Sequence, residues 1–182
     1  MEKRQRVIIL VLAVVFVLLV VYLAAVRKGV WFARERSVLA YFLSYDESRQ
    51  KNYLVPVRRR IERAKGQEDK IKAAVEQLLK GLTEEEKGAG LTSAVAEDAS
   101  LLEVRIEDDT TYLDFSKEIE QGGGTSMMMD RLGQIVFTAT QFYPVSKVRI
   151  LINGKFIKYF SGEGITDVEN PMGRDNFSYL VR

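Results

Sequence analysis

The spacing of hydrophobic and polar residues predicts two strands and a helix in the first half of the chain. Residues 37–45, "SVLAYFLSY", are rich in aromatic and aliphatic side chains and predict a buried strand. Residues 53–61 predict a second strand, and Pro56 places it at a sheet edge or a bulge. From Gln67 the apolar residues recur with a helical period and predict a helix: Ile71, Ala74, Val75, Leu78 and Leu79. Gly81 follows them and is suited to closing the helix. Residues 82–100 are expected to be a loop with a solvated acidic run.

The second half predicts two hairpins separated by another helix. Alternation along "LLEVRIEDDTTYLDFS", with Asp108 and Asp109 at the turn, predicts a hairpin with one apolar face. In residues 147–160, Asn153-Gly154 is a strong hairpin signal. The intervening helix ends before Pro144. It has an apolar side of Met128, Leu132, Ile135, Val136 and Ala139, opposite a polar side of Asp130, Arg131, Gln134, Thr138 and Gln141.

The order of these elements predicts an α+β domain. Each helix and strand has a single apolar side, which buries most simply if two helices pack on one face of a mostly antiparallel sheet. The last twenty residues have no clear period and are expected to drape over the domain.

The N-terminal segment predicts a single transmembrane helix. Val7 to Val26 is a run of twenty uncharged, apolar residues, and at about 1.5 Å per residue it reaches across roughly 30 Å of hydrocarbon. The run exceeds an ordinary signal-peptide core of ~7–15 residues, and no A-x-A-like site follows it. We therefore expect residues 1–6 to be a tail, 7–26 an uncleaved anchor, 27–36 a juxtamembrane linker and 37–182 one domain. Basic residues flank the anchor on both sides, so their bias alone leaves the orientation open.

Charge and composition restrict the classes of function. Residues 1–28 hold five of the 27 basic residues and one of the 25 acidic ones, so the remainder carries a net charge of −2. A slightly acidic domain lacks the basic footprint of nucleic-acid binding. The chain contains neither cysteine nor histidine, which excludes thiol chemistry, the usual zinc sites and a histidine base. We expect no metal, no cofactor and no small-molecule substrate.

The stretch from Tyr112 to Phe142 gathers the residues that most resemble an active site: Asp114, Ser116, Lys117, Glu118, Glu120 and the glycines Gly122, Gly123 and Gly124. Asp114 and Glu118 are candidates for a carboxylate pair of the glycosidase kind. The glycines, followed by Thr125 and Ser126, are candidates for a phosphate loop, but they match neither the Walker nor the dinucleotide pattern. The favoured interpretation is a structural loop with Thr125 or Ser126 as the helix cap.

Two further motifs have weaker support as functional sites. Ser48-Arg49-Gln50-Lys51 has the S-x-x-K spacing of serine transpeptidases, but it lies in a loop without the companion motifs K-T-G and S-D-N. The run Arg58 to Lys65 is a basic patch that suits lipid headgroups, although a solvated surface is favoured. No catalytic residue is therefore assigned.

Several of these stretches together resemble the GerMN domain family of sporulation and spore germination proteins. They run in family order from about Leu39 to Phe177: "LAYFL", "YLVPVRRRI", "AVEQLLKG", "GLTSAVAED", "LEVRIEDDTTYLDFSKE", "LGQIVFTATQFYPVSKVRILINGK" and "ENPMGRDNF". The most specific pieces are "DFS" from Asp114, "GQIV" from Gly133 and "TQF" from Thr140. The chain departs from the family pattern at Ala96 and Asp98, where the family usually has proline and glycine.

The resemblance implies a small module, similar to the ring-building motifs of spore envelope machinery, on lipoproteins or anchored proteins that face out of the cytoplasm. It carries over no catalytic residues. It favours a cytoplasmic tail, a single-pass anchor in the cell membrane and a non-enzymatic extracytoplasmic domain. That domain is expected to bind other envelope or sporulation proteins, or further copies of itself. The alternative is a cell-wall glycan-binding module or a hydrolase that uses Asp114 and Glu118.

Overall fold

A computed structural model describes Ala13, residues 15–20, 22–23, 37–62, 64–161, 164–165 and 167–182. The chain divides into two compact units, Met1–Ser37 and Val38–Arg182. Most of the predicted anchor, Val7 to Val26, lies outside the described residues. Those of its residues that are described are helical and exposed. Within the described part of the chain, no helix combines the length and the apolar character needed to cross a bilayer.

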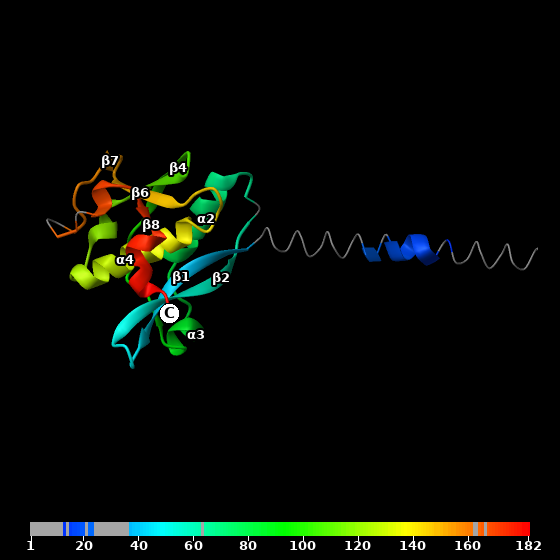
Figure 1. The fold of residues 1–182 in the computed structure, drawn as a ribbon, viewed down its shortest axis with the longest axis horizontal. Coiled ribbons are helices and arrows are strands. Elements are labelled where there is room, and N and C mark those ends of the chain that lie inside the picture. The colour runs from blue at the N-terminus through cyan, green and yellow to red at the C-terminus, as the bar shows by residue number, and fades with distance from the viewer. Residues whose placement is uncertain are drawn as a thin grey trace, which may run out of the picture. The chain divides into compact units, whose positions relative to one another are not determined.

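The first sheet contains three strands in the order β2-β1-β3 (Figure 1). Strand β1 spans Ser37–Asp46, β2 spans Lys51–Arg60 and the short β3 spans Leu91–Thr92. β1 is the central strand, and its alternation buries Val38, Ala40 and Phe42 in the core. β2 lies at the edge of the sheet, as Pro56 predicts.

The second sheet has the order β4-β5-β6-β7, and β8 pairs with β6. Its strands are β4 Leu101–Glu107, β5 Thr110–Phe115, β6 Lys147–Ile152, β7 Lys155–Phe156 and β8 Met172–Gly173. β4 and β5 form the predicted antiparallel hairpin. β5 and β6 are parallel, with Leu113 opposite Ile150. A parallel pair needs a long crossover, which helix α4, Thr125–Ala139, provides between them.

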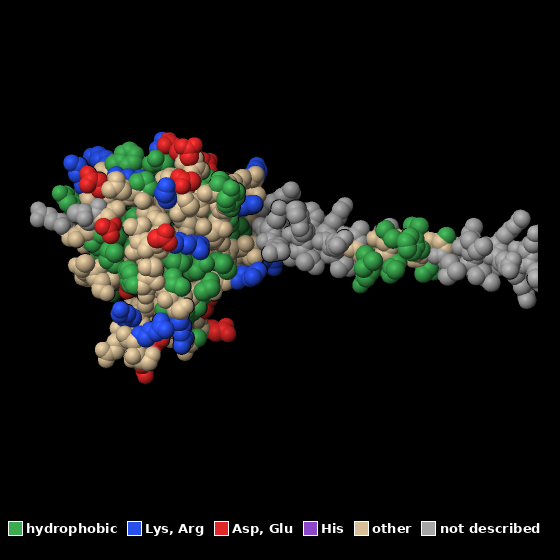
Figure 2. Space-filling model, in the orientation of Figure 1, with side chains coloured by type: hydrophobic (Ala, Val, Ile, Leu, Met, Phe, Trp, Pro, Cys, Tyr) green, Lys and Arg blue, Asp and Glu red, His purple; other side chains and the backbone are tan. Residues whose placement is uncertain are grey.

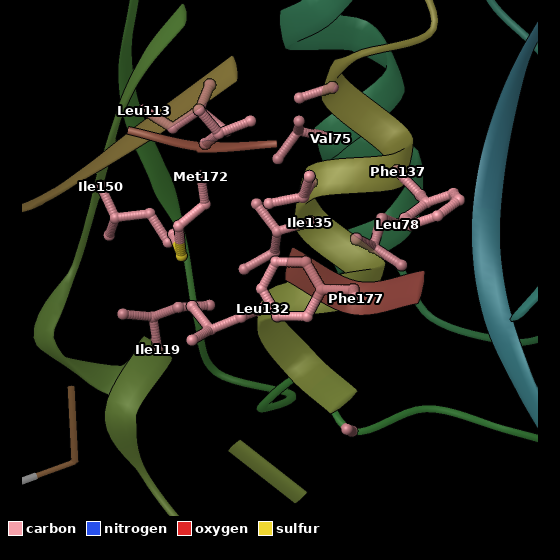
Figure 3. Packing of buried hydrophobic residues seen from close by; sticks show 14 of the residues in the cluster. Val75, Leu78, Leu113, Ile119, Leu132, Ile135, Phe137, Ile150, Met172 and Phe177 are labelled. Atoms are coloured by element: carbon pink, nitrogen blue, oxygen red, sulfur yellow. The ribbon is translucent and has the colours of Figure 1, made fainter. Parts of the chain in front are cut away.

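Helix α4 packs between the second sheet and β1. In Figure 3, Leu132 and Ile135 of α4 lie towards Leu113 and Ile150 of the sheet, whereas Phe137 points to the opposite side, where β1 runs. Helix α2, Gln67–Leu79, contacts both α4 and β4. A third, short helix, α3 Glu84–Gly88, begins with a capping box between Thr83 and Glu86.

The C-terminal segment completes the core. It contains the 3-10 helices η2 Asp167–Glu169 and η3 Arg174–Leu180, and a further one, η1 Lys117–Glu120, precedes α4. Phe177 and Leu180 of η3 are buried against α4. A Cβ atom added at Gly133 of α4 would lie 2.4 Å from Leu180 Cδ1, so glycine at this position lets η3 approach the helix closely.

The α+β class, both main helices and the mostly antiparallel pairing are confirmed, but the prediction of a single sheet was wrong. The structure has two sheets, and one strand pair is parallel. The predicted loop of residues 82–100 contains α3 and β3. The predicted cap at Thr125 or Ser126 was also wrong: α4 starts after Gly124 with no side-chain cap.

Candidate functional site

Asp114, the first candidate acid, fixes a neighbouring turn. Each of its carboxylate oxygens lies 2.9 Å from the backbone nitrogen of Gly154, which donates to them. Gly154 belongs to the tight β6–β7 turn, where it and Asn153 both have positive φ. The Asp114 side chain is buried. This carboxylate therefore stabilises the hairpin that the Asn153-Gly154 pair predicts.

The other polar residues of this stretch bind different partners. Ser116 Oγ accepts a hydrogen bond from Ser100 N at 3.1 Å, which ties the end of β5 to the start of β4. A hydrogen bond from the Ser116 side chain lowers the pKa of Glu118. Glu120 accepts from Ser161 N at 2.7 Å. The carboxylates of Asp114 and Glu118 are thus held by separate structural contacts.

The segment that leads into the triple glycine presents the carbonyls of Ile119, Gln121 and Gly122 to the guanidinium group of Arg131. Arg131 is only 1% exposed. Its Nε donates to Ala94 O at 2.6 Å, and its Nη atoms donate to the carbonyls of Ile119, Gln121 and Gly122. Gly122 and Gly123 have φ values of 71° and 90°, which favour glycine. The segment therefore presents carbonyl oxygens to a cation, whereas a phosphate site presents backbone N–H groups.

The polar side of α4 bonds to the part of β1 that the short strand β3 leaves unpaired. Thr138 Oγ1 accepts from Tyr41 N at 3.1 Å, and Gln141 bonds both the N–H and the C=O of Leu39. Gln134 donates to Tyr41 O at 2.8 Å and accepts from Ala94 N at 2.7 Å. These side chains replace a neighbouring strand, so the polar residues of the piece "GQIVFTATQF" serve the fold.

The S-x-x-K motif forms the β1–β2 turn. Ser48 Oγ donates to Asp46 Oδ1 at 2.6 Å, and Asp46 also accepts from the backbone nitrogens of Ser48 and Arg49. These hydrogen bonds lower the pKa of Asp46. The serine is therefore bound to an acceptor within the turn, and Lys51 begins the next strand.

The basic run from Arg58 to Lys65 is divided by the pleat of β2. Arg58 and Arg60 are exposed, whereas Arg59 is partly buried and forms an ion pair with Glu86 of α3. Arg59 Nη2 also donates to Gly81 O at 3.2 Å. Hydrogen bonding to Arg59 lowers the pKa of Glu86 to about 2. Arg59 therefore connects β2 with α3 rather than with a lipid surface.

A cleft at the β1–β2 turn is a candidate site that the sequence did not predict. Its volume is about 450 Å³, and its walls come from residues 46–53 and from the C-terminal residues 179–182. Figure 2 shows Lys and Arg side chains gathered over this turn and the C-terminal end. Because more than 120 residues separate the two walls in sequence, no local sequence motif predicts the cleft.

A buried carboxylate lies beside the cleft. Asp130 of α4 is 5% exposed and accepts a hydrogen bond from Asn52 Nδ2 at 2.7 Å. Burial raises the pKa of Asp130, and the bond from Asn52 opposes this change. Burial, together with the Asp130 and Asp167 charges, raises the pKa of Tyr179 to about 12. Asn52 and Tyr179 both line the cleft, and the bond from Asn52 to Asp130 connects its wall with α4.

Across the described ranges, no cluster of three or more acidic side chains is positioned to hold a metal ion.

A model of the Germane family, described as "Sporulation and spore germination", matches residues 39–158. The spore germination protein GerM of Bacillus subtilis (strain 168) is 33% identical over 119 residues, which are 63% of this chain and 31% of GerM. The chain therefore matches about a third of the length of this curated relative.

Solved structures share the fold. The first GerMN domain of the sporulation protein GerM from Bacillus subtilis is 22% identical with a TM-score of 0.59, covering 76% of this chain and 98% of that one. The tandem GerMN domains of GerM are 28% identical with a TM-score of 0.57, covering 77% and 45%. A predicted lipoprotein from Clostridium perfringens is 22% identical with a TM-score of 0.54, covering 77% and 88%.

The sequence match, the relative and the shared fold agree with the architecture of residues 37–182. The chain belongs to the Germane family of sporulation and spore germination proteins.

Proposed function

We propose that residues 37–182 form an extracytoplasmic module that binds or assembles with other proteins of the bacterial cell envelope during sporulation or spore germination. The observation that carries the proposal is the Germane match over residues 39–158. GerM, a relative at 33% identity, is described as a spore germination protein. The same type of domain in this chain is therefore assigned to the same process.

Attachment to the membrane is part of the proposal. Val7 to Val26 contains no charged residue over twenty positions, a length that suits a bilayer span. A structural neighbour is described as a predicted lipoprotein, which agrees with a domain held at a membrane. We propose a single-pass anchor with residues 1–6 in the cytoplasm and the domain outside.

A binding role is favoured over hydrolysis because the candidate acids are already used. Both oxygens of Asp114 accept from the Gly154 amide, so this carboxylate has a structural task. A glycosidase needs two carboxylates that flank the scissile bond. The glycan-binding alternative remains compatible with the polar cleft, and the experiment below distinguishes it by what the protein captures.

The test is capture of partners from intact envelopes. Full-length chain carrying an affinity tag is crosslinked in sporulating cells and purified from membranes, with the soluble fragment of residues 37–182 as the comparison. Specific enrichment of envelope or sporulation proteins supports the proposal. Recovery of cell-wall glycan without protein would support the alternative instead.

The orientation is tested separately. Protease added to intact cells should remove the domain while a cytoplasmic control protein survives. A domain that resists protease, although a known surface protein is digested, would contradict the extracytoplasmic placement.

A further inference from the structure

Three cationic side chains and one carboxylate line the cleft at the β1–β2 turn. Arg49, Lys51 and Arg182 line it. Neither Arg49 nor Lys51 makes an ion pair in the part of the chain that the structure describes, and both are exposed. Cations that line one cleft repel each other unless an anion lies between them. The cleft is therefore suited to a negatively charged group.

Asp46, the acidic residue that lines the cleft, already accepts hydrogen bonds within the turn. Asp46 accepts from Ser48 N at 3.0 Å, from Ser48 Oγ at 2.6 Å and from Arg49 N at 3.2 Å. Its Oδ2 lies 4.0 Å from Arg182 Nε. Asp46 thus fixes the turn and helps to position Arg182, while the side chains of Arg49 and Lys51 stay free to meet a ligand.

Aromatic side chains give the cleft a defined shape. The Arg182 guanidinium lies 5.1 Å from the centre of the Tyr53 ring, and its Nη1 is 3.4 Å from the Tyr53 hydroxyl. Tyr179 lines the cleft and is 46% exposed, and Val181 beside it is 55% exposed. Arginine and tyrosine are the residues that contribute most at protein interfaces. The wall therefore offers an apolar contact next to the charges.

We infer that this cleft binds an acidic segment of a partner protein, whose carboxylates contact Arg49 and Lys51 while an adjacent side chain packs on Tyr179. The inference rests on the proposed function as a protein-binding module. A volume of about 450 Å³ admits a few side chains. A long polyanion would instead follow an extended basic groove, and the net charge of −2 outside residues 1–28 argues against one.

A binding experiment with defined peptides tests this site. Full-length chain in uncharged detergent is titrated into fluorescein-labelled hexaglutamate, and fluorescence anisotropy gives the Kd. The double variant Arg49→Gln with Lys51→Gln should weaken binding about tenfold or more. The control Lys72→Gln with Lys155→Gln removes two exposed cations elsewhere and should change the Kd by less than about twofold.

Three outcomes would overturn the inference. Equal losses in the cleft and control variants would show diffuse attraction by net charge. Absence of hexaglutamate binding would exclude an acidic peptide. Tighter binding of a galacturonate hexamer or of polyphosphate than of hexaglutamate, lost in the cleft variant, would identify a glycan or a phosphate polymer as the occupant.

The capture experiment separates this inference from the proposed function. If wild-type chain captures envelope proteins and the cleft variant captures the same proteins equally well, the proposed function stands and the cleft inference fails. If wild-type chain captures no protein, the proposed function fails, whereas hexaglutamate binding that depends on Arg49 and Lys51 still supports an acidic ligand.

Discussion

Replacing Arg131 with methionine should strongly destabilise the domain. The substitution Arg131→Met keeps an unbranched apolar side chain but removes every donor to the carbonyls of Ala94, Ile119, Gln121 and Gly122. Ala94 and Ile119 are buried, whereas Gln121 and Gly122 are exposed. Water can therefore replace the arginine at the two exposed carbonyls but not at the two buried ones.

The expected loss follows from these two buried carbonyls. Each buried acceptor left without a partner costs about 1–3 kcal/mol. The four bonds are not simply additive, because burying the guanidinium also carries a desolvation cost of several kcal/mol. We expect the free energy of unfolding to fall by about 3–5 kcal/mol, a large share of the roughly 5–15 kcal/mol typical of a domain.

Urea unfolding of residues 37–182, followed by circular dichroism at pH 7, measures this change. Arg131→Lys serves as the comparison: it keeps the charge, but one ammonium group cannot reach all four carbonyls, so an intermediate loss is expected. A loss below about 1 kcal/mol for the methionine variant would refute the view that Arg131 organises the glycine loop.

Three further changes test other contacts. Because hydrogen bonding to Arg59 lowers the pKa of Glu86 from 4.5 to about 2, the stabilisation is present above pH 4.5 and is lost as the pH falls towards 2. Glu86→Gln should therefore cost about 1–2 kcal/mol in urea unfolding at pH 7 and almost nothing at pH 2. Asp114→Ala should lower the free energy of unfolding by about 1–2 kcal/mol, measured by thermal unfolding, and leave partner capture unchanged. Loss of partner capture with unchanged stability would contradict the structural role of Asp114. Gln134→Ala should cost about 2–4 kcal/mol by the same assay, since the Ala94 amide and the Tyr41 carbonyl lose their partner; unchanged stability would exclude this bridge.

Local patterns predicted the elements well where one side of an element meets the core. Ile71, Val75 and Leu78 of α2 are fully buried, as their spacing predicts. The Asn153-Gly154 pair forms its turn with positive φ at both residues. In each case the determinant lies within a few residues of sequence, which periodicity and turn chemistry can detect.

The same reasoning failed for the polar side of α4. Periodicity assigns polar residues to solvent, but Gln134 and Thr138 are completely buried. Their partners on β1 lie 93 and 97 residues away, so nothing near them in sequence indicates that a strand edge requires their hydrogen bonds. The single-sheet prediction failed for a related reason, since a helix placed between β1 and the other strands divides them into two sheets.

The hydrogen bonds between α4 and β1 also limit how the first sheet can polymerise. An unpaired strand edge is a template on which a second molecule adds its own strand. On β1 the backbone groups of Leu39 and Tyr41 are taken by amide and hydroxyl side chains of the helix, and Leu43 pairs with β3. Extension of this sheet into a fibril is consequently blocked at β1 for as long as α4 stays folded.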